Sequence, residues 1–368
     1  MTASGLTPRR ASVPADQRQL LAVAGVAVLY VVTGTAAWII AAPAVWAVDA
    51  QRNLAAAEAL MAGHFGTVEG YLYSPLAALM TAPFTLVPEA MAIWAWLAFK
   101  ALLVIVGALV ALRGRPALER TAAAIAAVAF LPIVYDLELG NVTVLLVAAV
   151  AFVAWCDDGY LTGVPLGLAL ATAPKPQLIF FLLWMILYRR RSLVGALATA
   201  AAATGLTVLV VGTDPYRGWI EALRAPPYLA SGKVINHSLT TLPAPLALVS
   251  VFASFVLALV AVRRGRWPAL TAALALGLLI SPFTLVYAAG IFLVVAPALW
   301  MGAPRALLAL AVAAPVGLVV AFPVWVFVLL VVAAVLPAAA WHDVGRNFPA
   351  GPESARQPTQ PAGATLSP

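Results

Sequence analysis

Long apolar segments recur along the whole chain, separated by short stretches that carry most of its charge. A helix needs about 20 apolar residues to cross a bilayer, and several of these segments approach or reach that length. Charged residues make up only 10% of the chain, so a soluble fold could not cover so much apolar surface. We therefore predict an all-α polytopic membrane protein. The apolar segments are 19–42, 75–88, 90–112, 121–135, 142–156, 161–173, 177–188, 193–212, 243–262, 268–281, 284–301, 306–321 and 323–340.

The two ends of the chain differ from this pattern. The N-terminal segment 1–18 carries three arginines before the first apolar run, and no small-residue cleavage site follows closely, so it does not resemble a signal peptide. We expect it to be cytoplasmic. The tail 342–368 is polar and rich in proline, and we expect it to be disordered and cytoplasmic. Between them lies the predicted transmembrane domain, 19–341. The single Cys156 excludes a disulfide scaffold.

The basic residues decide whether segment 75–88 crosses the membrane. If it does not cross, fifteen basic residues lie on one side and five on the other, with Lys100 inside a span. If it does cross, every later basic cluster moves to the side opposite the N-terminal arginines. The positive-inside rule favours the first arrangement, and Pro83 makes this 14-residue segment a poor span. About twelve spans remain, with outer loops 43–89 and 213–242. Lys100 either snorkels or is paired internally.

The first outer loop contains an acidic residue directly after the first span. Asp49 precedes a short apolar stretch that ends before Gly63, which predicts a membrane-surface helix over 50–62. Asp49 either caps this helix or acts as a general base for a bound hydroxyl, and the two roles are compatible. Tyr71 and Tyr73 follow in the same loop and are candidates for sugar or acceptor binding. Ser74 and Pro75 indicate another helix start.

Two further outer stretches carry unusual polar residues. Asp136 and Glu138 either bind a sugar or cation or are solvated loop charges, and Asn141 with Thr143 either binds a ligand or caps a helix. Lys175 lies between two prolines where two short apolar segments meet. An ammonium near the membrane needs a partner, so Lys175 either binds a lipid phosphate or pairs with Asp136 or Glu138.

The last outer loop is basic and aromatic, which suits an anionic headgroup or a carbohydrate. Most of its residues also suit a purely structural or interfacial position. The sequence contains no phosphate loop, dinucleotide fingerprint, zinc-protease motif or serine-hydrolase elbow. We expect no cofactor and no nucleic-acid partner, with a divalent cation left as an alternative at Asp136 and Glu138. The candidates in this loop are Arg217, Arg224, Asn236 and His237.

The order of these features resembles glycosyltransferase family 87, the polytopic mannosyl- and arabinosyltransferases of the GT-C fold that use polyprenyl-phosphate sugars. The resemblance covers roughly residues 20–300. It rests on Asp49 after the first span, Tyr73-Ser74-Pro75-Leu76-Ala77-Ala78, Gly140-Asn141-Val142-Thr143, Lys175-Pro176, Asn236-His237-Ser238 and Ser281-Pro282.

The resemblance implies a GT-C-like bundle of about twelve transmembrane helices in the plasma membrane, with both termini cytoplasmic and the active site outside. The donor would be a polyprenyl-phosphate sugar, mannose in the first place, and the acceptor a glycolipid or cell-envelope polysaccharide. Asp49 would act as the general base of an inverting transfer. Lys175, with Arg217, Arg224 or His237, would stabilise the leaving phosphate.

The chain departs from the family where a Trp and a His commonly follow the Ser-Pro. It has Phe283-Thr284-Leu285-Val286-Tyr287 there, so Tyr287 or His237 would have to replace that His. A transporter or flippase of lipid-linked or small polar substrates is the alternative function, because helices broken near 174–176 and 281–284 also occur in transporters.

Overall fold

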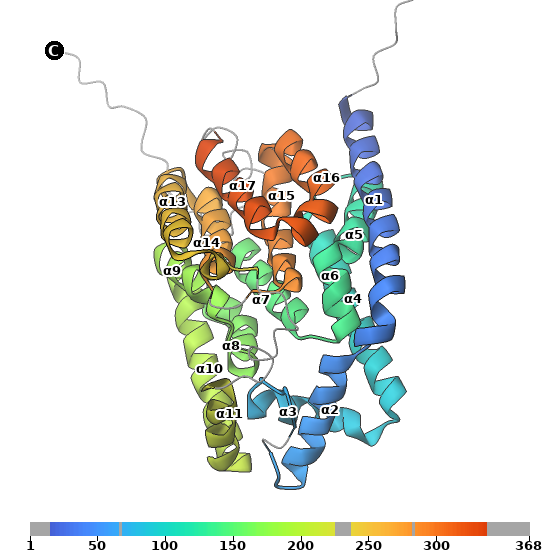
Figure 1. The fold of residues 1–368 in the computed structure, drawn as a ribbon, viewed down its shortest axis with the longest axis vertical. Coiled ribbons are helices and arrows are strands. Elements are labelled where there is room, and N and C mark those ends of the chain that lie inside the picture. Colours follow the sequence, from blue (N-terminus) through green and yellow to red (C-terminus); the bar gives the residue numbers. More distant parts are fainter. Residues whose placement is uncertain (1–14, 66–67, 225–236, 282–283, 337–368) are drawn as a thin grey trace, which may run out of the picture.

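The computed structural model describes residues 15–65, 68–224, 237–281 and 284–336, and these ranges contain helices and no β-strand. Most helices run along the long axis of the molecule (Figure 1). The expected tail 342–368 lies outside the described residues. The α-helices are α1 (Ala15–Val45), α2 (Val48–Met61), α3 (Pro75–Thr81), α4 (Glu89–Ala111), α5 (Ala117–Ala129), α6 (Leu131–Leu139), α7 (Thr143–Trp155), α8 (Val164–Thr172), α9 (Ile179–Tyr188), α10 (Arg190–Val211), α11 (Asp214–Arg224), α13 (Ala244–Val262), α14 (Arg266–Ile280), α15 (Ala296–Gly302), α16 (Pro304–Val320) and α17 (Phe322–Val335). The 3-10 helices are η1 (Ala82–Leu86), η2 (Leu161–Gly163), η3 (Pro176–Leu178), η4 (Leu239–Thr241) and η5 (Val286–Val294).

Four of the described helices are long and apolar enough to cross a membrane, namely α1 over Gln19–Ile40, α4, α10 and α13. The pair α5 and α6 passes the same test together but is bent by 54°. Pro132, in the first turn of α6, has no N–H with which to continue the hydrogen bonding of α5 across this bend. The protein is thus an all-α membrane protein, with four or five candidate spans among the residues that the structure describes. The other apolar helices have 10–17 residues, so helix length alone does not establish the expected twelve crossings.

The centre of the bundle is formed by helices that are apolar on every face. Helix α14 is buried along almost its whole length, from Trp267 to Leu279, and packs against α9, α13, α17 and η5. Helix α7 packs against α4, α8 and η5. A helix without a polar face is stable only when it is enclosed by others or by lipid, so these two occupy the core.

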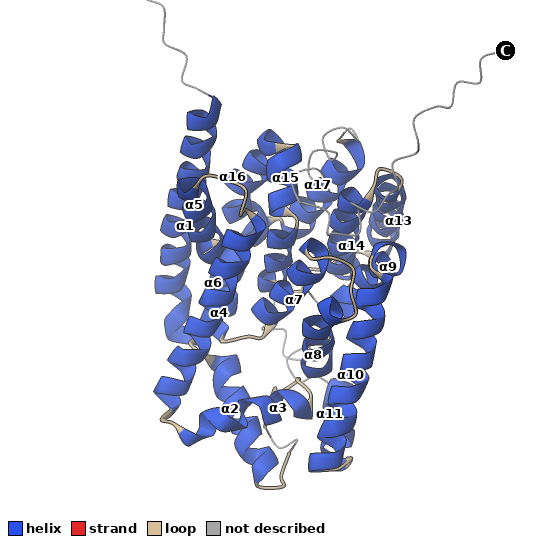
Figure 2. Cartoon of the chain, turned by 180° about the vertical axis from the view of Figure 1, so that it is seen from behind, coloured by secondary structure: helices blue, strands red, loops and turns tan. Residues whose placement is uncertain are grey.

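One end of the bundle carries three short helices. Figures 1 and 2 both place α2, α3 and α11 at the end opposite the start of α1. The surface helix expected over 50–62 is α2, which begins two residues earlier. Segment 75–88 is divided between α3 and η1 and forms no long continuous helix. This end therefore contains the short elements expected in the first outer loop.

Arginines of two loops contact other parts of the bundle, one at the start of α1 and one just after α17. Arg115 Nη2 donates to Gln19 Oε1 (3.1 Å), which joins the α4–α5 loop to the beginning of α1. Arg264 Nη1 donates to the carbonyl of Leu336 (2.6 Å) just after α17. Their cytoplasmic location stays a prediction.

Candidate active site

The site is organised around Asp49 in the first turn of α2. The chain turns sharply between α1 and α2 at Ala47, whose φ of 55° is left-handed and whose N–H donates to the carbonyl of Glu138 (2.6 Å). Ala47 occupies the N-cap position, so the expectation that Asp49 caps the helix is wrong. Because the helix begins one residue before Asp49, the carboxylate lies inside the first turn and is directed at other partners.

Two side chains contact the Asp49 carboxylate. Asn141 Nδ2 donates to Oδ2 (2.6 Å), and Arg52 Nη1 lies 3.3 Å from Oδ1. The other end of the Asn141 amide is fixed as well, because its Oδ1 accepts from the N–H of Thr143 (3.0 Å) and from its hydroxyl (2.8 Å). Asn141 therefore holds the start of α7, as considered for it, and also contacts Asp49; binding of a ligand by Asn141 stays a prediction.

Gly140 allows the turn before Asn141 to approach α2. Its φ is +70°, and a Cβ atom at this position would lie 2.5 Å from Cβ of Ala50. A side chain would force the turn away from α2. Glycine thus permits the short distance between Asn141 and Asp49.

Lys175 lies on the same side of the site, between two aromatic rings. Its Nζ is 5.6 Å from the ring centroids of both Tyr73 and Tyr287, and it interacts electrostatically with Asp49 and Asp136. Burial lowers the pKa of Lys175, while the two carboxylates oppose this shift. Burial and the nearby carboxylates together raise the pKa of Tyr73 well above its ordinary value. The site therefore pairs a cation with a neutral aromatic wall.

The approach of Tyr73 to Lys175 depends on the residues between Tyr73 and α3. Ser74 docks onto the end of α8, where its N–H donates to the carbonyl of Thr172 (2.9 Å) and its hydroxyl to that of Ala171 (2.5 Å). Tyr71 donates its hydroxyl to the carbonyl of Ser74 (3.3 Å). Ser74 is the N-cap residue of α3, as expected, but its side chain bonds α8 and not its own helix.

A buried ion pair lies next to these groups. Lys100 Nζ is 2.5 Å from Oδ1 of Asp136, and both side chains are fully buried. The internal pairing considered for Lys100 is thereby confirmed. Glu138 is also fully buried, and its carboxylate oxygens have no hydrogen-bond partner in the described part of the chain. We call Asp49, Tyr73, Lys100, Asp136, Asn141, Lys175 and Tyr287 the polar cluster.

Comparison with known proteins gives one match. The model of glycosyltransferase family 87 matches residues 71–320, which include Tyr73, Asn141, Lys175 and Tyr287. The chain belongs to this family. It is a glycosyltransferase. No curated protein matches the chain, and no solved structure does.

Two predicted members of the glycosyltransferase site lie on the exposed helix α11. Arg217 pairs with Asp214 (3.3 Å), with side chains 76% and 89% exposed, and Arg224 is exposed at the end of the helix. Trp219 of the same helix donates to the carbonyl of Leu72 (2.9 Å), which ties α11 to the loop that holds Tyr71 and Tyr73. Phosphate binding by the two arginines stays a prediction.

The other late residues of the glycosyltransferase occupy different surroundings. The His237 N–H donates to the carbonyl of Thr284 (2.8 Å), and its ring packs on Phe322 with centroids 5.0 Å apart. Burial lowers the pKa of His237, so this imidazole is neutral at pH 7. Asn236 lies outside the described residues. Of the two candidates to replace the family's His, Tyr287 is the one beside Lys175.

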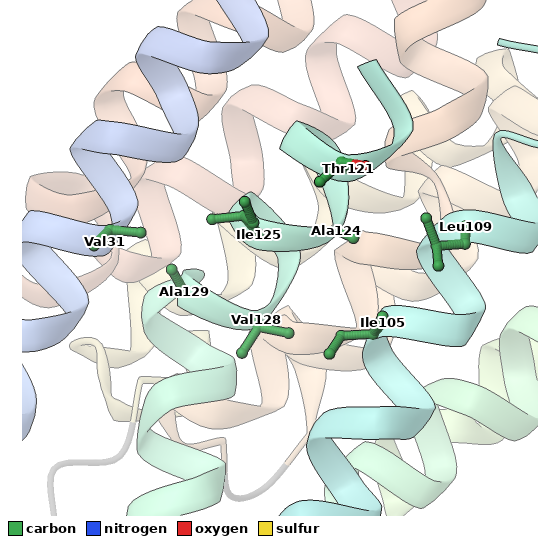
Figure 3. A pocket seen from close by; sticks show the side chains of 8 residues that line it. All are labelled: Val31, Ile105, Leu109, Thr121, Ala124, Ile125, Val128 and Ala129. Carbon is green, nitrogen blue, oxygen red and sulfur yellow. The ribbon is translucent and has the colours of Figure 1, made fainter. Parts of the chain in front are cut away.

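An apolar groove of the glycosyltransferase lies apart from the polar cluster. It has a volume of about 380 Å³ and lies between α1, α4 and α5 (Figure 3). The groove is lined by Val31, Ile105, Leu109, Thr121, Ala124, Ile125, Val128 and Ala129.

Among the described residues, no group of three or more His, Cys, Asp or Glu side chains could hold a metal ion.

Proposed function

We propose that this glycosyltransferase moves a sugar, mannose in the first place, from a polyprenyl-phosphate donor to a glycolipid or cell-envelope polysaccharide. The transfer takes place on the non-cytoplasmic face of the plasma membrane and inverts the anomeric centre. The observation that carries the proposal is the electrostatic interaction of Lys175 with Asp49 inside the polar cluster. These two residues are the best suited of the cluster to phosphate binding and to base chemistry.

Asp49 is the proposed general base. Its carboxylate accepts the proton of the acceptor hydroxyl while the acceptor oxygen attacks the anomeric carbon. The bond between that carbon and the phosphate oxygen breaks, and its electron pair leaves with the lipid phosphate. Asn141 holds one carboxylate oxygen at 2.6 Å, and the other oxygen lies next to the partly exposed Arg52. This fixed geometry reduces the entropy lost in reaching the transition state.

Lys175 is the proposed partner of the leaving phosphate. An ammonium between two aromatic rings is partly removed from water, so its attraction for a developing phosphate charge is stronger than at an exposed position. Arg217, Arg224 and His237 are additional proposed donors to the phosphate. Sugar and acceptor contacts are assigned to Tyr71, Tyr73, Asp136, Glu138, Asn141, Asn236 and Tyr287.

The test is the Asp49→Asn variant in membranes supplied with labelled polyprenyl-phosphate mannose. Removal of a general base is expected to reduce transfer about 100-fold or more at normal expression. Glu58→Gln is the matched control, since Glu58 is an exposed acid on the same helix, and it is expected to transfer at the wild-type rate. Undiminished transfer by Asp49→Asn would overturn the assignment of the base.

The sugar and the stereochemistry need separate measurements. Parallel assays with labelled polyprenyl-phosphate arabinose decide between the two sugars, and faster transfer of arabinose would contradict the choice of mannose. The product linkage determined by NMR should have the anomeric configuration opposite to that of the donor. A retained configuration would exclude direct in-line attack.

A further inference from the structure

We infer that Trp96 and Lys100 of α4 form a clamp that positions Asp49 through Asn141. This inference rests on the proposed function, because it concerns the geometry of the proposed base. Both are positioning residues, and neither is assigned a contact with substrate. The family assignment and the polar residues of the outer loops do not point to either of them.

The clamp consists of two donors on one face of α4. Trp96 and Lys100 are four residues apart and so lie one above the other on the helix. Trp96 Nε1 donates to the carbonyl of Gly140 (2.9 Å), and Lys100 Nζ donates to the carbonyl of Asp136 (2.7 Å). The two acceptors bracket the last turn of α6 and the turn that follows it. Helix α4 therefore holds this stretch at both of its ends.

The ammonium of Lys100 is fixed by an ion pair as well as by its hydrogen bond. The fully buried ion pair with Asp136 keeps the ammonium of Lys100 at the carbonyl. That same carbonyl accepts from the N–H of Asn141 (3.1 Å). Lys100 and the Asn141 backbone thus share one acceptor oxygen, so a displacement of Lys100 acts directly on Asn141.

Two contacts transmit this position to α2. Asn141 Nδ2 donates to the Asp49 carboxylate at 2.6 Å. Gly140 lies so close to Ala50 of α2 that a Cβ atom on residue 140 would not fit between them. Lys100 also interacts electrostatically with Asp49. If the clamp is released, the turn is free to move away from α2, and the hydrogen bond that orients Asp49 is lengthened or lost. Displacements of about 1 Å at a reacting group can cost as much as 100-fold in rate.

The mildest test is Trp96→Phe, which keeps an aromatic ring and removes the N–H donor. We expect kcat to fall about 10-fold, with KM for the donor unchanged within about twofold, because orientation of the base and not donor binding is affected. Trp155→Phe is the matched control, since its indole N–H also donates to a backbone carbonyl, that of Val294 (2.9 Å). It is expected to leave kcat unchanged. A fall in kcat common to both variants would overturn the inference.

A mutant cycle tests whether the clamp acts through Asn141. Trp96→Phe and Asn141→Ala are measured singly and together in the full-length protein. If both act by orienting Asp49, the combined variant loses at most about twofold beyond Asn141→Ala alone. Losses that multiply would show independent effects and would overturn the inference.

A readout without turnover separates this inference from the proposed function. The infrared band of the Asp49 carboxylate is identified by subtracting the spectrum of Asp49→Asn from that of the wild type. The band should shift in Trp96→Phe and stay in place in Trp155→Phe. If the band does not shift, the clamp is refuted even where Asp49→Asn is inactive. If the band shifts but Asp49→Asn transfers sugar at the wild-type rate, the proposed base is refuted and the clamp stands.

Discussion

At the scale of single residues, the surroundings of Lys175 set its chemistry. The rings of Tyr73 and Tyr287 shield the ammonium from water and form cation–π contacts with it. Asp49 and Asp136 supply opposite charge. Burial lowers the pKa of Lys175, and the two carboxylates raise it. The net shift is downward, so the charged form exists over a narrower pH range than in an exposed lysine.

This shift predicts a pH dependence of transfer. The pKa of Lys175 is lowered, so the ammonium loses its proton as the pH rises through a value below its ordinary 10.5. As the pH is raised, kcat/KM should therefore begin to fall at a pH below 10.5. In Lys175→Arg the guanidinium keeps its charge, so any residual activity should lack this fall. The same alkaline fall in both proteins would assign the titration to another group.

Gly140 provides a second prediction. Gly140→Ala combines a left-handed backbone with a Cβ atom placed against Ala50, and we expect a loss of about 1–3 kcal/mol in stability together with a loss of transfer. Gly63→Ala is the control, because Gly63 has a φ of +77° with open space around it. It should lose only the backbone contribution, about 1–2 kcal/mol, and keep its transfer rate. Thermal unfolding and turnover of both variants decide this, and equal losses would remove the role of the close approach.

At the scale of secondary-structure elements, the bundle relies on contacts between distant helix ends. Helix α10 begins at Arg190, and the first-turn donors are satisfied by Asp158, which lies before η2. The carboxylate accepts from the N–H (2.9 Å) and the hydroxyl (2.9 Å) of Ser192 and from the N–H of Arg191 (3.3 Å). Partial burial acts against ionisation of Asp158, but these hydrogen bonds outweigh it and lower its pKa.

This cap predicts a pH-dependent stability difference. Asp158→Ala should destabilise the protein by about 1 kcal/mol at pH 7, as is typical for a lost helix cap. Because the pKa of Asp158 is lowered in the folded state, its contribution is present above the unfolded pKa and disappears as the pH falls through the lowered value. Thermal unfolding at neutral and acidic pH measures this. The control is Asp157→Asn, a change at the exposed neighbour, and an equal loss there would contradict a capping role.

The sequence predicted the elements at the site better than their contacts. Asp49 and Lys175 stood out because they are polar residues in an apolar chain, and the surface helix α2 followed from its flanking signals. The pairing of Lys100 with Asp136 and the donation from Trp96 to Gly140 join residues 36 and 44 positions apart. Such contacts depend on how α4 packs beside α6, which hydrophobic pattern does not determine. Lys100, as a lysine within an apolar span, was a signal for internal pairing, and the three-residue spacing of Asp49 and Arg52 was one for their contact.

At the scale of the whole molecule, the two ends of the bundle differ in charge and in architecture. One end carries α2, α3 and α11, while Arg115 contacts the start of α1 at the opposite end and Arg264 contacts the residue that follows α17. The number of crossings could not be read from the sequence, because many apolar segments form helices of 10–17 residues that end at bends. Proline and the broken α5–α6 pair account for part of this division.

The orientation of the bundle is tested by cysteine labelling in intact cells. In a Cys156→Ser background, Arg217→Cys on α11 should react with a membrane-impermeant maleimide, and Leu118→Cys at the opposite end should react only after permeabilisation. Both positions are accessible, since the side chain of Arg217 is 76% exposed and Leu118 is 62% exposed. Labelling of Leu118→Cys without Arg217→Cys would invert the proposed topology.

Helix α4 faces two environments at once. One face carries Trp96 and Lys100, and the other exposes large apolar side chains such as Trp94, Phe99 and Leu102, which suit acyl chains. A span adjusts its tilt and depth to the thickness of the surrounding hydrocarbon. Because the same helix holds the turn next to Asp49, we expect a change in lipid chain length to alter the position of the proposed base. The bilayer would then be a structural component of the enzyme as well as its solvent.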